Sequence, residues 1–193
     1  MAGRRVAAGL VLAAVALTAA GCGLVGGSKT VTVVGTTTVT TTQTITTTGS
    51  VASAKPCAGT DLAVVFTLVP GSAGAGQIAY ALTAKNSSPS PCSVHGVPQG
   101  TLLGATGTAL PTHVTGTGGR RIVLPPGATA VAQARFSPDV AGDGDSQSGA
   151  CQPQAHTFQL TTGGGGVTEA AIKPPTSVCE RGTLHFEPFG YAG

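Results

Sequence analysis

Glycine and proline interrupt the chain from residue 55 to residue 193 so often that no long helix fits between them. The 193 residues include 30 Gly and 13 Pro, and both residue types destabilise a helix interior. The apolar runs between them are short. One of these, "QIAYALTAKN" (77–86), places Ile78, Tyr80, Leu82 and Ala84 at alternate positions, which is typical of a strand with one buried face.

Further strands are predicted in runs that are bounded by turn residues. These runs are 61–69, 101–110, 120–136, 156–162, 167–173 and 183–189. We expect a hairpin across Pro125-Pro126-Gly127 and a second hairpin across the four glycines Gly163–Gly166. Strands separated by frequent turns indicate an all-β domain, specifically an antiparallel β-sandwich that is immunoglobulin-like in general architecture. We assign residues 55–193 to this domain.

The N-terminus has the pattern of an exported lipoprotein. Arg4 and Arg5 precede the apolar stretch Val6–Ala20, and small residues then lead to Cys22. A basic start, an apolar stretch and small residues before the cleavage point define a signal peptide. A cysteine directly after that point is suited to attachment of diacylglycerol. We therefore expect residues 1–21 to be removed and Cys22 to carry the lipid that anchors the protein to the membrane.

The alternative is an uncleaved transmembrane helix. Residues 6–28 carry no charge, and about 20 apolar residues suffice to span a bilayer. The glycines Gly21, Gly23, Gly26 and Gly27 weaken a helix there. Under either interpretation the rest of the chain lies outside the cytoplasm, at the outer face of the cell membrane.

Threonine dominates the segment between the anchor and the β domain. In "TVTVVGTTTVTTTQTITTT" (30–48), twelve of the nineteen residues are Thr. Low complexity beside a lipid anchor is typical of a stalk, so we interpret residues 22–54 as a disordered, Thr-rich linker. The alternative is an N-terminal strand in which valine and threonine alternate.

The four remaining cysteines, Cys57, Cys92, Cys151 and Cys179, predict two disulfides because an even number of cysteines in an exported domain forms a covalent framework. Three pairings are possible, and we favour the sequential one, Cys57–Cys92 and Cys151–Cys179. A zinc site would be the alternative, but no C-x-x-C spacing is present. No metal or other cofactor is expected.

Charge argues against nucleic acid as a partner. Ten basic residues face seven acidic ones, and removal of Arg4 and Arg5 leaves eight against seven. The chain contains no basic stripe, which is the footprint expected of a nucleic-acid-binding surface.

Several spaced segments together resemble the actinobacterial lipoprotein domain family of unknown function numbered 4232. They are Cys57 with Asp61-Leu62, "NSSPSPCSVHGVP" (86–98), "LPPGATAVA" (124–132), Cys151, Pro174-Pro175, Cys179 and the closing "FEPF" (186–189). The resemblance implies an exported β domain with paired cysteines. It implies no established activity and supplies no catalytic residues.

No residue pattern indicates catalysis. The histidines are His95, His113, His156 and His185. A Ser–His–Asp enzyme needs a nucleophile on a constrained turn, and no G-x-S-x-G occurs. We interpret all four histidines as structural or exposed.

The acidic residues Asp139, Asp143 and Asp145 lie close together in the sequence. They could bind Ca²⁺ through carboxylate oxygens, but the segment lacks the remaining pattern of an EF-hand. We interpret it as a solvated loop.

These observations favour a non-enzymatic, lipid-anchored module that binds an unknown envelope protein or ligand. Loops such as Gly71–Gly76 or Asp139–Gly149 are the expected binding segments, because loops at the end of a sandwich commonly carry function. The alternatives are an envelope hydrolase that uses a His/Asp pair and a purely structural spacer.

The anchor can be tested by intact mass of membrane-extracted protein. We expect a chain that starts at Cys22 and carries acyl groups, with four thiols that are labelled only after reduction. The variant Cys22→Ala should lose the acyl mass. A mass that includes Met1 would contradict lipidation, and labelling before reduction would contradict the two disulfides.

Overall fold

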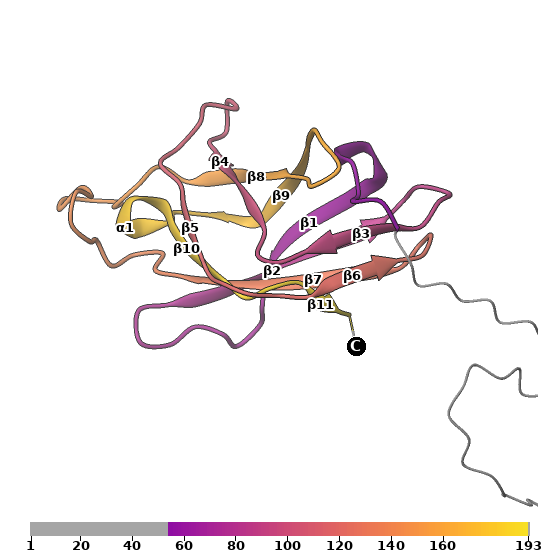
Figure 1. Ribbon diagram of the computed structural model, residues 1–193. Coiled ribbons are helices and arrows are strands. Elements are labelled where there is room, and N and C mark those ends of the chain that lie inside the picture. The colour runs from indigo at the N-terminus through magenta and orange to yellow at the C-terminus, as the bar shows by residue number, and fades with distance from the viewer. Residues whose placement is uncertain (1–53, 193) are drawn as a thin grey trace, which may run out of the picture. The chain divides into compact units, whose positions relative to one another are not determined.

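The antiparallel pair of strands β1 (Leu62–Leu68) and β2 (Ile78–Asn86) lies at the centre of the fold (Figure 1). The computed structural model describes residues 54–192. Leu62, Val64 and Phe66 on β1 and Tyr80, Leu82 and Ala84 on β2 are buried at alternate positions, as the alternation of apolar residues predicts, whereas Ile78 is half-buried. All of the described residues belong to one compact unit. Cys22, the predicted signal peptide and most of the predicted stalk lie outside the described residues.

The other strands are β3 (Cys92–His95), β4 (Gln99–Leu103), β5 (His113–Thr115), β6 (Arg121–Leu124), β7 (Thr129–Phe136), β8 (Ala155–Thr161), β9 (Val167–Thr176), β10 (Thr183–Phe186) and β11 (Gly190–Tyr191). The helical elements are η1 (Gly59–Asp61) and α1 (Cys179–Gly182). This nearly all-β content confirms the predicted fold class. None of the helices among residues 54–192 is long and apolar enough to cross a membrane.

Nine strands form one sheet, in the order β4-β8-β9-β1-β2-β7-β10-β5 with β11 beside β7, and β3 and β6 form a second sheet. Most neighbours are antiparallel, but β1 pairs with β9 and β5 pairs with β10 in parallel. Those two parallel pairs were not anticipated from the sequence. In both pairs the neighbours within the sheet are far apart in the chain, so no short turn dictates their relative direction.

The large sheet bends back on itself, so that its two halves form the layers of a sandwich. Four strands separate β8 from β10 in the sheet order, yet the rings of Phe158 on β8 and Phe186 on β10 have centroids 5.6 Å apart. Phe66 on β1 contacts both rings, at 5.7 and 5.8 Å. Figure 1 shows β4, β8 and β9 on one side of the core and β7, β6 and β11 on the other.

The core is lined by small as well as large side chains. Strand β7 buries Ala130, Ala132, Ala134 and Phe136. The Phe136 ring meets the ring of Tyr80 on β2 at 5.3 Å. The alanines place less bulk between the layers, which leaves space for the aromatic rings that occupy the middle of the core.

The predicted hairpin across Pro125-Pro126-Gly127 is wrong. Strand β6, which precedes this turn, pairs with β3, whereas β7, which follows it, pairs with β2. The turn therefore carries the chain from one sheet to the other. The hairpin predicted across the four glycines is confirmed, because β8 and β9 form an antiparallel ladder around them.

Both disulfides have the sequential pairing that we favoured. Cys57–Cys92 ties the segment before β1 to the start of β3, and Cys151–Cys179 ties the long loop after β7 to α1. The two disulfides close loops with sequence separations of 35 and 28 residues. In the chain-entropy account each disulfide stabilises the fold by about 3.5–4 kcal/mol.

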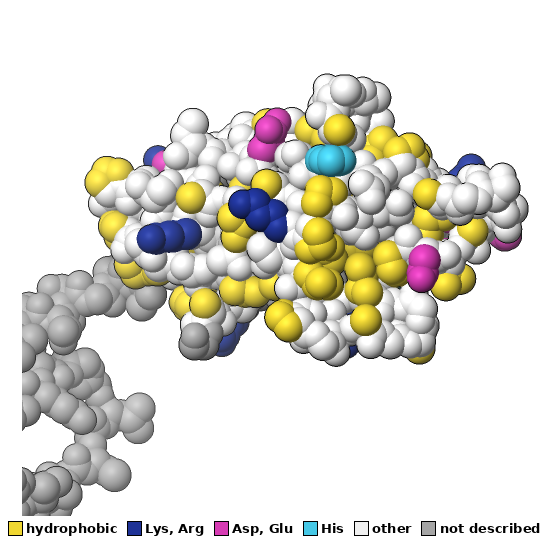
Figure 2. All heavy atoms as spheres, turned by 180° about the vertical axis from the view of Figure 1, so that it is seen from behind, with side chains coloured by type: hydrophobic (Ala, Val, Ile, Leu, Met, Phe, Trp, Pro, Cys, Tyr) yellow, Lys and Arg dark blue, Asp and Glu magenta, His cyan; other side chains and the backbone are white. Residues whose placement is uncertain are grey.

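The outer surface carries few charges, as a chain with 9% charged residues requires. Figure 2 shows one face on which apolar side chains form a continuous patch and the charged groups stand singly around it. Val65 on β1 is 41% exposed, and Val167, at the start of β9, is 50% exposed.

Asn86 is a polar residue at the end of β2 that is fully buried. Its amide nitrogen donates hydrogen bonds to the backbone carbonyls of Leu124 (2.8 Å) and Ser90 (2.9 Å). Its side-chain oxygen accepts hydrogen bonds from the backbone N–H and the hydroxyl of Ser88, at 2.9 and 2.8 Å. One side chain thus joins the turn after β2 to the end of β6.

We expect Asn86→Ala to lower the free energy of unfolding by about 2–4 kcal/mol, because it leaves the polar partners of Asn86 without hydrogen bonds. Urea denaturation with both disulfides intact measures the change. Ser87→Ala is the control: this exposed hydroxyl makes one bond, to the Asp61 carbonyl, and its loss should change stability by less than about 0.5 kcal/mol. Equal effects of the two substitutions would contradict the role of Asn86.

Candidate functional site

The chain leaves one sheet and enters the other over only three residues, and this crossing opens a pocket. Strand β3 ends at His95, and β4 begins at Gln99 in the large sheet. Between them, Gly96 has a φ of 71°, a conformation that glycine adopts without strain. Because β3 stays with β6 and β4 joins β8, the two sheets diverge at this point.

The pocket in this divergence has a volume of about 420 Å³, within the range of small-molecule binding sites. Its lining comes from the segment before β1, from β1, β3, β4, β6 and β8, and from the loops around them. The lining residues are Pro56, Cys57, Leu62, Ser93, Val94, His95, Val97, Pro98, Gln99, Arg121, Leu160, Thr161, Thr162, Gly163 and Phe189.

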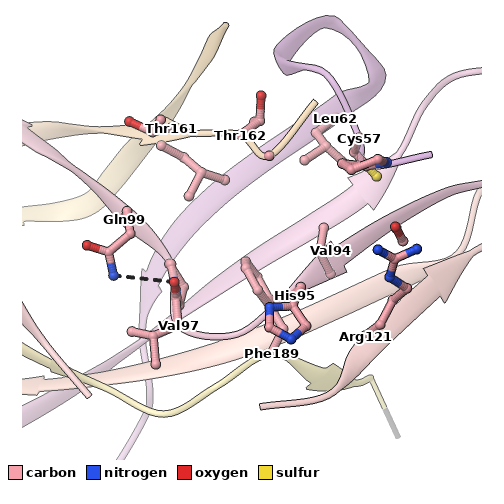
Figure 3. A pocket seen from close by; sticks show the side chains of 15 residues that line it. Cys57, Leu62, Val94, His95, Val97, Gln99, Arg121, Thr161, Thr162 and Phe189 are labelled. Atoms are coloured by element: carbon pink, nitrogen blue, oxygen red, sulfur yellow. Dashed lines mark hydrogen bonds between the residues drawn. The ribbon is translucent and has the colours of Figure 1, made fainter. Parts of the chain in front are cut away.

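The polar groups of the pocket lie on opposite sides of it. Figure 3 shows His95 and Arg121 on one side and Thr161 and Thr162 on the other, with Gln99 at the end nearest Val97. His95 and Arg121 are direct partners in the β3–β6 ladder, and opposite partners on antiparallel strands project their side chains to the same face. This arrangement places several hydrogen-bonding groups around one apolar hollow.

The pocket is held together by its surroundings. The Cys57–Cys92 disulfide fixes the segment before β1 against β3. Ser93 strengthens this contact, because its backbone N–H donates to the Lys55 carbonyl and its carbonyl accepts from the Cys57 N–H, both at 2.9 Å. On another side, the Phe189 N–H donates to the Gly96 carbonyl at 3.0 Å. These covalent and hydrogen-bonded contacts hold the walls of the pocket in place.

The sequence patterns did not indicate this pocket. The prediction that His95 is structural or exposed is confirmed, since its side chain is exposed, but its place in the lining was not predicted. The predicted binding segments were Gly71–Gly76 and Asp139–Gly149. Neither segment contributes to the lining. The one available signal was the cross-strand pairing of His95 with Arg121, and that pairing depends on the association of β3 with β6, which local sequence patterns do not reveal.

The other three histidines lie elsewhere. His113 on β5 and His185 on β10 are exposed, and His156 on β8 is half-buried. His185 Nδ1 lies 2.7 Å from the Thr115 hydroxyl. His156 lines a second, more open hollow of about 500 Å³. Within residues 54–192 no hydrogen bond joins a histidine to a carboxylate, so the His/Asp hydrolase alternative gains no geometric support there.

The loop that contains Asp139, Asp143 and Asp145 was predicted to be solvated, but it is solvated only in part. Asp139 and Asp143 are exposed, but Asp145 is buried. Its carboxylate accepts hydrogen bonds from the backbone N–H groups of Gly142, Glu180 and Arg181 and from the side-chain amide of Gln152. The loop is folded around this carboxylate.

Asp145 stabilises an uncommon backbone conformation. Glu180 and Arg181 have φ values of 54° and 57°, in the left-handed region that residues with a side chain rarely adopt. The two successive N–H groups point to one place, where they form an anion site. The carboxylate of the chain's own Asp145 occupies it.

These contacts also argue against a metal ion at this position. Asp145 lies close to Cys151 and Cys179, but the two sulfur atoms are bonded to each other, whereas a metal requires thiolate. The carboxylate oxygens are already used by four donors. The cluster is structural.

The pKa of Asp145 reflects this environment. Burial would raise it, but the hydrogen bonds from Gln152, Gly142, Arg181 and Glu180 outweigh burial and lower the pKa from 3.8 to about 2. A carboxyl group whose pKa is depressed in the folded state stabilises that state above its ordinary pKa and loses this effect as the pH falls through the lower value.

A family model described as "Domain of unknown function (DUF4232)" matches residues 57–190. This span includes all four disulfide-bonded cysteines and every lining residue of the pocket except Pro56. No curated protein matches the chain significantly, and no solved structure does.

We expect Asp145→Asn to be less stable than the wild type at pH 7, with a difference that shrinks as the pH falls from about 4 to about 2. The amide group replaces an acceptor oxygen with a donor that faces other donors. Denaturation at several pH values measures the difference, and hydrogen exchange at the Glu180 and Arg181 amides should be faster in the variant. Asp143→Asn, an exposed neighbour in the same loop, is the control; if it had the same effect, the assignment to Asp145 would be wrong.

Proposed function

The chain belongs to the DUF4232 family, and we propose that it is a non-enzymatic, lipid-anchored binding module whose ligand occupies the pocket between β3 and β8. The pocket carries this proposal. It is preformed, it is lined by apolar side chains with a few convergent polar groups, and its volume suits a small molecule. These are the usual features of a binding site.

The placement of the pocket supports a role at the cell envelope. Lys55 and Pro56, the residues that follow the predicted stalk, pair with β3 at the edge of the pocket. The lipid on Cys22 would hold the domain at the outer face of the membrane. Both disulfides suit an oxidising compartment outside the cytoplasm.

The chemistry of the lining favours binding over catalysis. The titratable side chains that line the pocket are His95 and Arg121. No carboxylate is available among the lining residues to orient the histidine or to act as a general base, and no activated nucleophile lies beside it. The lining can recognise a molecule by shape, hydrogen bonds and charge.

We expect Gln99→Trp to abolish ligand binding, because the larger side chain fills the pocket from the end nearest Val97. Residues 50–193 would be incubated with an extract of envelope small molecules and studied by native mass spectrometry. The wild type should retain a ligand mass that Gln99→Trp lacks.

The matched control is Gln133→Trp, the same substitution at an exposed position of β7 that does not line the pocket. It should keep the ligand mass. The pocket is not the binding site if Gln99→Trp retains the same mass, or if the wild type retains none.

A further inference from the structure

Arg121, which is exposed, is the only side chain in the lining of the pocket that carries a formal charge at pH 7. His95 lies directly opposite it in the β3–β6 ladder, and no aspartate or glutamate lines the pocket. The potential inside the pocket is therefore positive on the His95 and Arg121 side, and it favours an anionic group there.

The Arg121 guanidinium is only weakly engaged by the protein. Within residues 54–192 its hydrogen bond is to the Ala54 carbonyl, at 3.4 Å, which is close to the limit for such a bond. The neighbouring Arg120 differs, because its guanidinium lies 5.9 Å from the centre of the Tyr191 ring and does not line the pocket. Most of the donor capacity of Arg121 thus remains available to a ligand.

The interior of the same pocket is apolar. Leu62, Val94, Leu160 and Phe189 line it, and all four are buried. In Figure 3, Leu62 lies beside Cys57, and Val94 lies between Leu62 and His95. A ligand that fills this volume gains affinity from an apolar body in contact with these side chains.

We propose that the ligand is a small amphipathic carboxylate, with its carboxylate on Arg121 and its apolar body on the buried side chains of the pocket. A single guanidinium matches the planar, two-oxygen geometry of a carboxylate. A phosphate is less suited, because it carries more charge and the lining offers neither a lysine nor a helix N-terminus to it. This inference rests on the proposed function, because it names the ligand class of that pocket.

The far side of the pocket is suited to a polar substituent. The Thr161 side chain is exposed there, and the Gln99 amide is engaged only by a long hydrogen bond of 3.5 Å to the Val97 carbonyl. The Thr162 hydroxyl is already committed to the carbonyl of Gly165, at 2.8 Å. Thr161 and Gln99 are thus the groups that remain for a hydroxyl or amide on the ligand.

Two probes of the same shape test the charge. The first is 2-naphthoate, which has a carboxylate on an apolar body, and the second is 2-naphthamide, in which a neutral amide replaces the carboxylate. Binding to residues 50–193 would be followed by the NMR shifts of backbone amides in β3, β6 and β8. We expect naphthoate to bind about five- to tenfold more tightly than naphthamide, as a hydrogen-bonded charge requires.

Two arginine variants then locate the effect. Arg121→Gln should abolish the preference for naphthoate, because it weakens naphthoate binding more than naphthamide binding. Arg120→Gln removes the same charge from the adjacent residue and should keep the preference. Amide spectra of the free variants establish that both are folded.

The remaining outcomes separate the carboxylate inference from the proposed function. Equal binding of the two probes by the wild type overturns the carboxylate inference but leaves the pocket as a binding site. Equal effects of the two arginine substitutions also overturn it, because net charge and not Arg121 would then be responsible. Absence of pocket shifts with either probe, even at millimolar concentration, counts against the inference and the proposed function together.

Discussion

The packing of Phe66 against rings from both ends of the large sheet is the contact on which the rest of the domain depends. Phe66 lies within 5.8 Å, centroid to centroid, of Tyr80, Phe158 and Phe186. Tyr80 is on the neighbouring strand β2, but Phe158 and Phe186 come from β8 and β10, which four strands separate in the sheet order, so their meeting closes the sheet into two layers. The closure hides the apolar faces of the strands from water, which is the main driving force for a fold with so few helical contacts.

The closed sheet also decides where a binding site can form. Up to His95 the chain lies in the small sheet, where β3 pairs with β6. It then turns at Gly96, and β4 begins in the large sheet. The pocket is the space left by this change of sheet, and the Cys57–Cys92 disulfide keeps its wall in place. Its position follows from the topology and not from any motif.

Buried polar side chains stabilise the loops, as apolar packing stabilises the strands. Asn86 and Asp145 are both buried, and each satisfies several backbone groups that have no partner in a ladder. Segments without regular structure need such partners, because unpaired backbone groups away from water are costly. The Asp145 carboxylate shows the point most clearly: it holds two left-handed residues in place and fills the anion site that they create.

Much of the fold could be predicted from the sequence, because the relevant physics is local or covalent. The alternation in 77–86 depends on neighbouring residues, and β2 confirms it. The even number of cysteines after Cys22 predicted two disulfides, and the favoured pairing is present. The family resemblance is likewise confirmed, since the spaced cysteines and turns that carry it are properties of the chain itself.

Only the tertiary structure decided which strand pairs with which. The run 120–136 contains two strands and a turn, as expected, but its two strands belong to different sheets, since partner choice depends on burial across the whole core. For the same reason Asp145 became a buried structural group, and His95 and Arg121 became neighbours at a pocket. The sequence by itself determined most strands and both disulfide bridges, whose causes are local or covalent, whereas the site exists only where distant segments meet.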